Sequence, residues 1–595
     1  MGKFIPDAEQ QDLLLRKGVY PYDHVDCAAK LTETSLPPKD SFYSLLTEQH
    51  ISDADYQHAK TVWDTFRCTT LGDYHDIYLK SDVLQLADVF ENFRSVCLDN
   101  YHLDPAHYYT APGLSWDAML LSTGVKLDLI TDIDMYLMVE SGIRGGISMI
   151  SQKYAKANNP YIEDHDPEKT TSYIMYLDAN NLYGWAMSEC LPSGNFQWLD
   201  DDALKNLDIQ QVAADADTGY ILEVDLEYPE DIHDLHSDYP VAPERKAVAK
   251  EELSPYSQAL YDELQVKGKP TEKLIPTLYN KKKYVIHYNN LQLYLRLGLR
   301  LTKIHRAVSF TQSKWLAPYI ALNTEKRKAA RNPFEKDFYK LMNNSVFGKT
   351  MENVRKRINV KLAVNERQMK RQVAKPEFHR FKIFNEHLIG VHLKQCNLVL
   401  NKPIYVGMAI LDLSKTLMYR FHYDYMRPKY DHVDLLFTDT DSLCYHIETQ
   451  DIYDDMKADA FHFDTSDYPA DHPLHSTANK KIIGKMKDET AGVAISEFVG
   501  LRSKMYSMTY GEKEKKTAKG IGRSSIRKMR HAEYRDCLLN RQTNTATSNT
   551  IQSHGHRIYS EHLTKTALSP FDDKRYVLEN GFSTLAHGHY HTQQV

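Results

Sequence analysis

Long apolar runs are absent from this sequence. No apolar stretch approaches ~18 residues, the length that a membrane-spanning helix needs. The first residues, Met-Gly-Lys-Phe-Ile-Pro-Asp-Ala-Glu, also lack the apolar core of a signal peptide. We therefore expect an intracellular protein, in the nucleus or the cytoplasm, that does not bind a membrane.

Paired cysteines are missing as well. The 595 residues include seven Cys, and no two of them form a Cys-x-x-Cys pair. This scatter is typical of reduced thiols and excludes a cysteine zinc module.

The composition is that of a globular protein with separated charges. Hydrophobic residues make up 42% and charged residues 26% of the chain, the mean hydropathy is −0.53, and at ~100 to 200 residues per domain the length predicts three to five domains. The net charge of −7 conceals two basic segments, 326–361 with eleven Lys or Arg against three acids and 502–530 with ten against two, whereas 199–238 holds thirteen acids and one Lys. Such runs are usually solvated, but two basic segments could also line one groove for a phosphate backbone.

A predicted hairpin carries the most informative acidic pair. Asp439 and Asp441 lie between two short apolar runs, residues 435–437 and 443–447, each with the length of a buried strand. Side chains of a strand alternate, so both carboxylates are expected on the same side of the hairpin tip. Two close carboxylates are costly unless a cation neutralises them, and hard oxygen ligands favour Mg²⁺ or Mn²⁺ over zinc. Other Asp-x-Asp matches in the chain, such as residues 53–55 and 215–217, lack these apolar flanks and are explained by solvated turns.

A third acid follows another predicted strand. Residues 173–177, Tyr-Ile-Met-Tyr-Leu, form a strand candidate that ends on Asp178. An acid at the end of a buried strand could be a further ligand of a cation held by Asp441, although a strand-terminating Asp in a turn explains the pattern equally well. Residues 180–184 then turn the chain into a short segment that ends near Leu191.

Helix signals begin at Asn332, which is suited to be an N-cap, with Pro333 as the first helical residue and Glu335 as the capping-box partner. Gly348 is expected to end this helix. A basic helix ending near Arg331 precedes it, so the two form a predicted helical hairpin. Helical spacing places one set of side chains on one face, where it could bind a triphosphate and the base it carries: Lys336, Lys340, Asn344 and Phe347.

The first 120 residues are predicted to be mostly helical. Apolar residues recur at helical spacing over residues 79–93, and Tyr78 and Asp82 lie one turn apart at the start of this helix. From spacing alone, the pair is an ordinary surface contact.

Taken together, these stretches resemble the motifs of family B DNA polymerases. The three polymerase motifs correspond, in order, to residues 178–183 (Asp-Ala-Asn-Asn-Leu-Tyr), 340–348 (Lys-Leu-Met-Asn-Asn-Ser-Val-Phe-Gly) and 439–442 (Asp-Thr-Asp-Ser). Residues 504–506, Lys-Met-Tyr, resemble the Lys-x-Tyr primer-strand motif, and residues 142–146 resemble the Tyr-x-Gly-Gly linker with Ile in place of Tyr. The spacing and the C-terminal residues 572–590 resemble the protein-primed branch carried by virus-like mobile elements of the Polinton or Maverick type.

The resemblance implies an α+β fold with the right-hand architecture of palm, fingers and thumb and a partial N-terminal exonuclease-like domain. Eight segments follow from it, with boundaries good to about ten residues. They are an exonuclease-domain remnant (1–110), a linker (111–172), the first part of the palm (173–199), an insertion (200–315), the fingers (316–349), a second insertion (350–402), the second part of the palm (403–507) and the thumb (508–595).

The resemblance also implies two-metal phosphoryl transfer at a site that uses two Mg²⁺ ions, or Mn²⁺. Catalytic and metal-binding roles fall to Asp178, Asp439, Asp441 and the carbonyl of Ala179. Nucleotide-binding roles fall to Tyr183, which would exclude a 2′-hydroxyl, and to Lys328, Lys336, Lys340, Asn344 and Phe347. Roles in DNA binding fall to Gly145, Gly146, Ser345, Gly348, Ser442, Lys504 and Tyr506.

The implied partners are template and primer DNA, deoxynucleoside triphosphates and a terminal protein that supplies the priming hydroxyl. Tyr78 and Asp82 resemble the last exonuclease motif, but the strands that would carry the earlier exonuclease acids are missing, so no proofreading is expected. Either the chain is truncated relative to its relatives or the activity was lost. A catalytically silent nucleic-acid-binding protein is the alternative. A nuclease leaves the lysine face unexplained, and a reverse transcriptase is disfavoured because its Tyr followed by adjacent Asp residues is absent.

Overall fold

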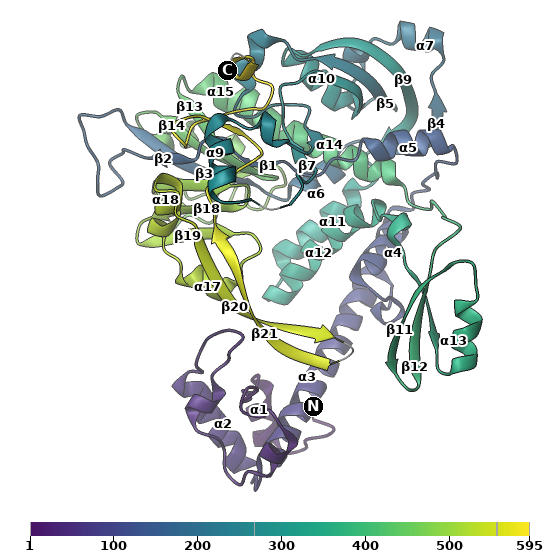
Figure 1. Ribbon diagram of the computed structural model, residues 1–595, viewed down its shortest axis with the longest axis vertical. Coiled ribbons are helices and arrows are strands. Elements are labelled where there is room, and N and C mark those ends of the chain that lie inside the picture. Colours follow the sequence, from purple (N-terminus) through teal and green to yellow (C-terminus); the bar gives the residue numbers. More distant parts are fainter. Residues whose placement is uncertain (1, 267, 555–556, 594–595) are drawn as a thin grey trace. The chain divides into compact units, whose positions relative to one another are not determined.

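The computed structural model describes residues 2–266, 268–554 and 557–593 (Figure 1). The chain divides into two compact units. One comprises Met1–Thr110, Gly522–Lys528 and Ala546–Lys565, and the other comprises Ala111–Ile521, Met529–Thr545 and Thr566–Val595.

The first unit is helical over residues 2–110, where the structure has no β-strand and a single isolated bridge between Ser44 and Gln49. Its longest element, α3, begins with a capping box between Thr70 and Asp73 and ends at His102 in the left-handed conformation. This helix confirms the one predicted over residues 79–93. The α-helices of this segment are α1 (Ala8–Leu15), α2 (Asp53–Thr65) and α3 (Leu71–Tyr101).

A ten-stranded sheet forms the centre of the second unit. Its main path runs in the order β1 (Ser148–Ile150), β13 (Val433–Asp439), β14 (Ser442–Glu448), β3 (Ser172–Ala179), β17 (Ile495–Arg502), β18 (Met505–Tyr510) and β19 (Lys513–Ala518). Three short strands attach to this path, namely β2 (Tyr154–Lys156), β15 (Phe463–Asp464) and β16 (Met486–Asp488).

Strand β3 is buried on both faces, which explains its nearly continuous apolar sequence. Tyr173, Met175 and Leu177 join the larger core, and Ile174 and Tyr176 join a smaller core. Because side chains alternate along a strand, the sheet separates these two cores. The strand predicted to end at Asp178 is therefore confirmed and extends one residue further, to Ala179.

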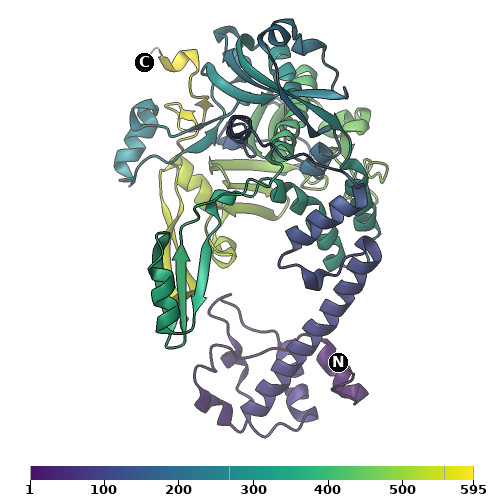
Figure 2. The ribbon, with the colours of Figure 1, turned by 90° about the vertical axis from the view of Figure 1, so that its right-hand side faces the viewer.

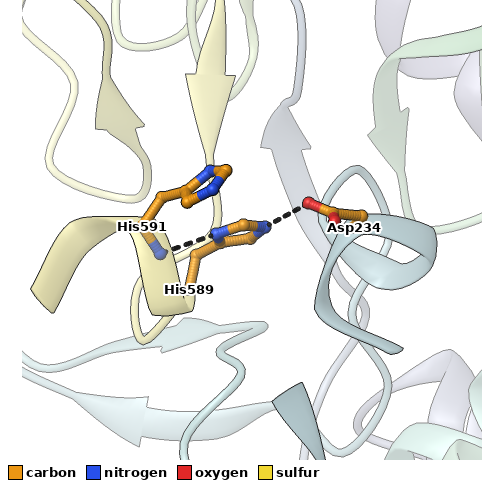
Figure 3. Close-up of side chains that lie close together, drawn as sticks. All are labelled: Asp234, His589 and His591. Carbon is orange, nitrogen blue, oxygen red and sulfur yellow. Dashed lines mark hydrogen bonds and ion pairs between the residues drawn. The ribbon is translucent and has the colours of Figure 1, made fainter. Parts of the chain in front are cut away.

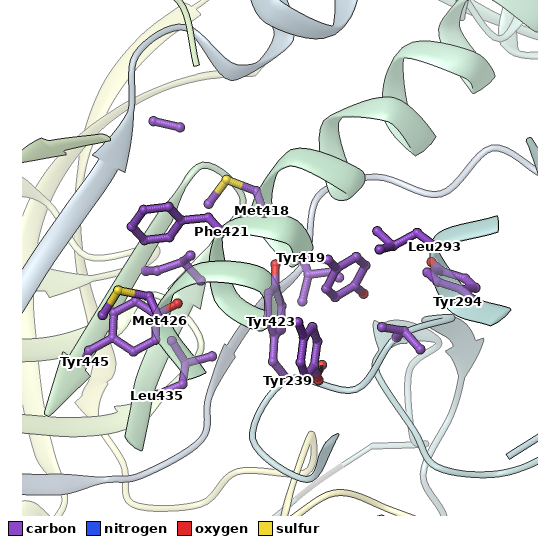
Figure 4. Packing of buried hydrophobic residues seen from close by; sticks show 14 of the residues in the cluster. Tyr239, Leu293, Tyr294, Met418, Tyr419, Phe421, Tyr423, Met426, Leu435 and Tyr445 are labelled. Atoms are coloured by element: carbon purple, nitrogen blue, oxygen red, sulfur yellow. Dashed lines mark hydrogen bonds between the residues drawn. The ribbon is translucent and has the colours of Figure 1, made fainter. Parts of the chain in front are cut away.

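Tyrosines fill much of the larger core (Figure 4). Helix α14 (Ile404–Arg420) is buried along nearly its whole length. The hydroxyl of Tyr419 donates to the carbonyl of Pro240 at 3.1 Å, and that of Tyr423 donates to the carbonyl of Tyr239 at 2.6 Å. Each ring thus fills apolar space while its hydroxyl is hydrogen-bonded to a backbone oxygen.

Two smaller sheets lie mostly in the segments predicted as insertions, although β4 of the first sheet precedes residue 200. The first has the order β4 (Leu191–Trp198), β9 (Arg300–Ser313), β5 (Thr218–Glu227) and β8 (Lys281–His287). The second has the order β10 (Asn359–Ala363), β12 (Leu388–Leu393) and β11 (Phe378–Asn385), and α13 (Glu366–Val373) packs on it (Figure 2). This sheet has a core of its own, formed by Ala363, Ile389, Val391 and Leu393.

Helices α11 (Ala317–Ala329) and α12 (Pro333–Thr350) form the predicted helical hairpin. The side chain of Asn332 accepts from the amide of Glu335 at 2.9 Å, which confirms the predicted N-cap. The predicted capping box does not form, because the Glu335 carboxylate accepts from the amide of Arg331 and not from that of Asn332. The prediction that Gly348 ends the helix was wrong. A Cβ at Gly348 would meet no atom within 4 Å, and the helix continues to Thr350, so this glycine meets no steric demand there.

The remaining long elements include α4 (Ala111–Thr123), α5 (Ile133–Ser141), α6 (Leu182–Met187), α10 (Tyr288–Arg296), α18 (His531–Leu539) and the ribbon of β20 (Asn544–His554) with β21 (Arg557–Leu568). Within the part of the chain that the structure describes, no helix has both the length and the apolar character that crossing a membrane requires.

Candidate active site

The predicted hairpin lies beside the predicted acidic strand. β13 pairs with β14, and β14 pairs with β3 so that Ser442 stands opposite Asp178. The amide of Ala179 donates to the carbonyl of Asp441 at 2.7 Å. Asp178, Asp439 and Asp441 therefore lie at one end of three adjacent strands, as the hairpin and strand predictions required.

The turn of this hairpin is held by the segment that precedes β1. Thr440 has a positive φ of 69°, and its amide donates to the carbonyl of Ile147 at 2.7 Å. A Cβ at Gly146 would lie 2.4 Å from the Thr440 side chain, so only glycine fits at this close approach. The glycine pair predicted to contact DNA thus has one member packed on the acidic turn, while Gly145 is exposed.

Like charges and burial act together on these carboxylates. Burial first, and then the charges of Asp441 and Glu489, raise the pKa of Asp178 to about 8. The pKa of Asp441 is also raised, mainly by burial and further by Asp439. Strongly perturbed acids that destabilise one another are characteristic of functional sites.

Cations from other elements surround the acids. The ammonium of Lys504 lies 2.9 Å from Oδ1 of Asp439, and the charge of Lys340 lowers the pKa values of Asp178 and Asp441. Lys515 pairs with Glu489 at 3.2 Å and also lowers the pKa of Asp178. Sequence reasoning missed Glu489 and Lys515, since neither lies in a recognisable motif and only the pairing of β18 with β19 and the course of the chain after β16 bring them here.

Two aromatic rings predicted to border the nucleotide are in contact. Tyr183 of α6 stacks on Phe347 of α12, with ring centroids 4.6 Å apart and an angle of 18° between the planes. Asn344, one turn before Phe347, is exposed on the same helix. Asn181 has a positive φ of 46°, and a Cβ on Gly184 would lie 2.1 Å from its side-chain nitrogen, which explains why a larger residue is absent after Tyr183.

A small cavity of about 120 Å³ is lined by five cations and by the carboxylates of Asp464 and Asp467. Two of the predicted lysines, Lys336 and Lys340, line it, but Lys328 does not; its ammonium pairs with Glu325 at 2.9 Å. Three further cations that sequence reasoning missed line the cavity: Arg327, Lys481 and Lys487.

Cations in this cavity repel one another. The pKa of Lys481 is lowered by burial and by the charges of Lys336 and Arg327. Among the described residues, Lys336, Lys340 and Lys481 take part in no ion pair with a carboxylate, whereas Lys487 pairs with Asp467. A multiply charged anion would relieve this repulsion, so the cavity has the electrostatics of a phosphate site.

The segment that carries Lys481 is fixed to the strand that carries Asp178. Asp464 accepts from the backbone amide of Lys481 at 2.8 Å and from the side chain of Asn180 at 2.7 Å. The backbone of Asn180 also exchanges hydrogen bonds with Gly484 and Lys485. No local pattern identifies Lys481, because these contacts bridge about 300 residues of sequence.

The remaining predicted DNA-binding residues differ in exposure. Gly348 is exposed, whereas Ser345 and Ser442 are buried. The ring of Tyr506 is only 4% exposed and stacks on Phe437 with centroids 4.4 Å apart. Tyr506 therefore supports the acidic hairpin from within the core, while the side chain of Lys504 reaches the carboxylates.

The predicted exonuclease pair lies in the other unit. The hydroxyls of Tyr78 and Tyr22 are 2.7 Å apart, and burial, Tyr22 and Asp82 all raise the pKa of Tyr78. Asp7, the first acid of the Asp-Ala-Glu triplet at residues 7–9, caps α1 by accepting from the amide of Gln10. The carboxylate of Asp7 therefore serves as a helix cap in this structure.

Comparison with known families identifies the fold. The family model described as DNA polymerase type B, organellar and viral, matches residues 12–427. The chain belongs to this family. The family match and the mixed helix-and-sheet architecture confirm the predicted fold class and assign the protein to the DNA polymerases.

Solved structures similar to this type B polymerase include three of phi29 DNA polymerase. The orthorhombic crystal form and the ternary complex with primer-template DNA and incoming nucleotide substrates each have 13% sequence identity and a TM-score of 0.49. The post-translocation binary complex with primer-template DNA has 14% identity and a TM-score of 0.47. Each alignment covers 93% of this chain and 79% of the other. No curated protein matches the sequence.

Proposed function

We propose that this polymerase adds deoxynucleotides to a primer 3′-hydroxyl, under the direction of a DNA template, by two-metal phosphoryl transfer. One observation carries the proposal: the crowded carboxylates of β3 and the β13–β14 hairpin lie close to Lys340, whose charge acts on Asp178 and Asp441 and which also lines a cavity rich in cations. An acidic group for metal ions next to a basic group for phosphates is the arrangement that nucleotidyl transfer requires.

The carboxylates fit divalent cations. Burial and neighbouring carboxylates raise the pKa values of Asp178 and Asp441, which a bound cation would oppose, and oxygen donors suit Mg²⁺, or Mn²⁺ in its place. Asp178, Asp439, Asp441 and the carbonyl of Ala179 would hold two ions. When bound, these ions activate the primer hydroxyl and neutralise charge on the leaving pyrophosphate.

The protein's own groups would position the nucleotide. Lys336, Lys340 and Lys481 would bind the triphosphate in the cavity, with Arg327 beside them. Tyr183, held by its stack on Phe347, would contact the sugar and exclude a 2′-hydroxyl, and Asn344 would border the nascent base pair. Lys328 would act at the entrance, since it lies outside the lining of the cavity.

The primer terminus would lie near Lys504. The ammonium of Lys504 contacts Asp439. Lys504 lies in the turn between β17 and β18, where its backbone has a positive φ of 60°. Tyr506 and Ser442 would act from beneath as buried supports, and the exposed Gly145 and Gly348 would allow the DNA backbone to approach closely.

Primer extension tests this function. The purified chain, a 5′-labelled primer on a longer template, Mg²⁺ and single deoxynucleotides should give incorporation of the nucleotide complementary to each template base. A chelator should stop the reaction and added Mg²⁺ should restore it. Absence of extension, or extension that ignores the template base, would remove the proposed activity.

We further propose that synthesis starts on a Ser, Thr or Tyr hydroxyl of a terminal protein, during replication of a virus-like mobile element or a virus genome. The acidic segment between Asp200 and Asp238 supports a basic partner, because it would repel a phosphate backbone. The enzyme should form a covalent adduct when mixed with labelled nucleotide and the terminal protein encoded beside it. Extension of a DNA primer without any adduct would leave the polymerase and remove protein priming.

This 595-residue chain is also proposed to lack proofreading. Residues 2–110 contain no β-strand that could carry the additional acids of a two-metal exonuclease, and Asp7 is occupied as a helix cap. A mismatched primer 3′ end should therefore persist in the absence of nucleotides. Degradation that Asp82→Ala abolishes would contradict this proposal.

A further inference from the structure

A cluster of two histidines and an aspartate lies apart in sequence from the polymerase motifs (Figure 3). Asp234 belongs to the short helix α8 (His233–His236), and His589 and His591 belong to the C-terminal segment. One ligand atom from each residue can be chosen so that all three lie within 4.8 Å of one another. We propose that these three side chains form a site for a transition-metal dication, Zn²⁺ in particular.

The chemistry of the donors determines the class of ion. Two imidazole nitrogens and one carboxylate oxygen suit Zn²⁺ and related transition metals and do not suit Mg²⁺, which prefers oxygen ligands. Three protein ligands leave the fourth tetrahedral position for water. The cluster therefore differs in kind from the carboxylates of the palm, and the inference does not depend on the proposed polymerase mechanism.

The distance between two of the proposed ligand atoms matches such a site. Nε2 of His589 and Oδ1 of Asp234 are 3.1 Å apart, close to the separation of two ligands about 2.0 Å from a shared tetrahedral ion. Nδ1 of His589 accepts from the backbone amide of His591 at 3.2 Å. This second hydrogen bond fixes the ring and places its proton on Nε2, which faces Asp234 (Figure 3). Binding of an ion at Nε2 would therefore move the ring proton to Nδ1, at the expense of the bond to the His591 amide.

Neighbouring groups orient the ligands. The hydroxyl of Tyr590 donates to Oδ2 of Asp234 at 2.9 Å, so an ion would take the place of the Nε2 proton of His589 at Oδ1. The side chain of His589 is fully buried. His233 has a backbone partner at both ring nitrogens, the amide of Tyr590 at Nδ1 and the carbonyl of Tyr228 at Nε2, and is not one of the three proposed ligands.

Exposure permits metal entry. Asp234 and His591 are both exposed, so an ion reaches the cluster from solvent without unfolding the chain. Binding would tie residues 589–591 to α8, about 355 residues earlier in the sequence. The bound ion is expected to hold the C-terminal segment on the insertion between the first two polymerase motifs.

Metal titration of the untagged, full-length protein tests the proposal, since an affinity tag of histidines would bind the same ions. After removal of metals with a chelator, Zn²⁺ should bind in a 1:1 ratio in competition with a chromophoric chelator, and a 100-fold excess of Mg²⁺ should not displace it. His591→Ala and Asp234→Asn should each weaken binding at least about tenfold. Both residues are exposed, so these variants should keep their fold, which circular dichroism can verify.

Controls separate this site from others. His562→Ala removes another exposed histidine, in β21, and should leave the affinity unchanged. Asp441→Asn should also leave it unchanged, which keeps the test independent of polymerase activity. Cobalt substitution should give the visible absorption of a four-coordinate ion in the wild type and not in His591→Ala. No stoichiometric Zn²⁺ binding, or equal affinity in wild type, His591→Ala and Asp234→Asn, would overturn the proposal.

Discussion

Two groups of charged residues with low exposure in the larger unit differ in the charges of their neighbours. At the ends of β3 and the β13–β14 hairpin, Asp178 and Asp441 are crowded by like charges, and their pKa values are raised. In the core, Asp412 and Lys415 of α14 are 2% and 5% exposed. Burial raises the pKa of Asp412 and lowers that of Lys415, and the charge of each residue offsets part of the shift of the other. Buried opposite charges offset part of the cost of each other's burial, whereas buried like charges add to it and are characteristic of functional sites.

Both residues of the core pair, Asp412 and Lys415, have hydrogen-bond partners in the backbone. The ammonium of Lys415 donates to the carbonyls of Arg144 and Leu411 at 2.8 and 2.9 Å, and Asp412 accepts from the amide of His287 at 2.9 Å. Burial lowers the pKa of Lys415 to about 8. Because the palm acids have fewer such partners, variants of the two groups should affect different properties.

The largest effect is expected for Asp441→Asn. Loss of this carboxylate should reduce nucleotide incorporation by about 10³-fold or more, because it removes the group that holds the ions in the transition state. Single-turnover primer extension measures the loss. Asp202→Asn, at an exposed position outside the site, should retain full activity. Extension by Asp441→Asn at a rate near wild type would end the assignment of this acid.

Lys415→Met should instead act on stability. It leaves the charge of Asp412 buried with Arg144 as its remaining cation, so the free energy of unfolding should fall by about 3 to 5 kcal/mol. Denaturant unfolding followed by circular dichroism measures the change, with Lys205→Met as an exposed control expected within about 0.5 kcal/mol of wild type. A Lys415→Met protein as stable as wild type would show that the core pair is dispensable.

Tyr183→Ala should act on selectivity alone. Removing the ring that stacks on Phe347 should lower the preference for deoxy- over ribonucleotides by about 10- to 100-fold, because the clash with the 2′-hydroxyl is lost. Relative kcat/KM values for the two nucleotides report this. Tyr183→Phe, which keeps the ring, should retain the wild-type preference, and an unchanged ratio in Tyr183→Ala would exclude Tyr183 as the gate.

The smallest effect is expected at the cation cavity. Lys481→Ala should raise the KM for deoxynucleotides about tenfold while Lys336 and Lys340 continue to bind phosphate. The exposed neighbour Lys480 provides a matched control, since Lys480→Ala removes the same charge one residue away, outside the lining of the cavity. Equal KM values in both variants would exclude a specific role for Lys481.

Much of this site follows from local sequence signals. Alternating and continuous apolar residues predict the hairpin of Asp439 and Asp441 and the strand before Asp178, and a capping motif at Asn332 predicts the start of α12. These signals suffice because strand periodicity and helix caps depend on neighbouring residues.

Other features depend on contacts distant in sequence. Lys481 and Glu489 reach the site through turns without a motif, and the cluster of Asp234 with His589 and His591 joins segments about 355 residues apart. Helix α12 continues past Gly348, where the sequence predicts its end. The position next to Gly348 is open space, so nothing in the local sequence distinguishes this glycine from one that ends a helix.

Asp178→Asn, assayed on one preparation for both unfolding and incorporation, tests the central claim most directly. The pKa of Asp178 is raised from 3.8 to about 8, so folding disfavours its ionised form and the metal-free protein loses stability as the pH rises through that interval. At pH 8 the variant should unfold at a temperature equal to or above that of wild type, while incorporation with Mg²⁺ falls by about 10³-fold. A lower unfolding temperature, or incorporation at the wild-type rate, would contradict the account.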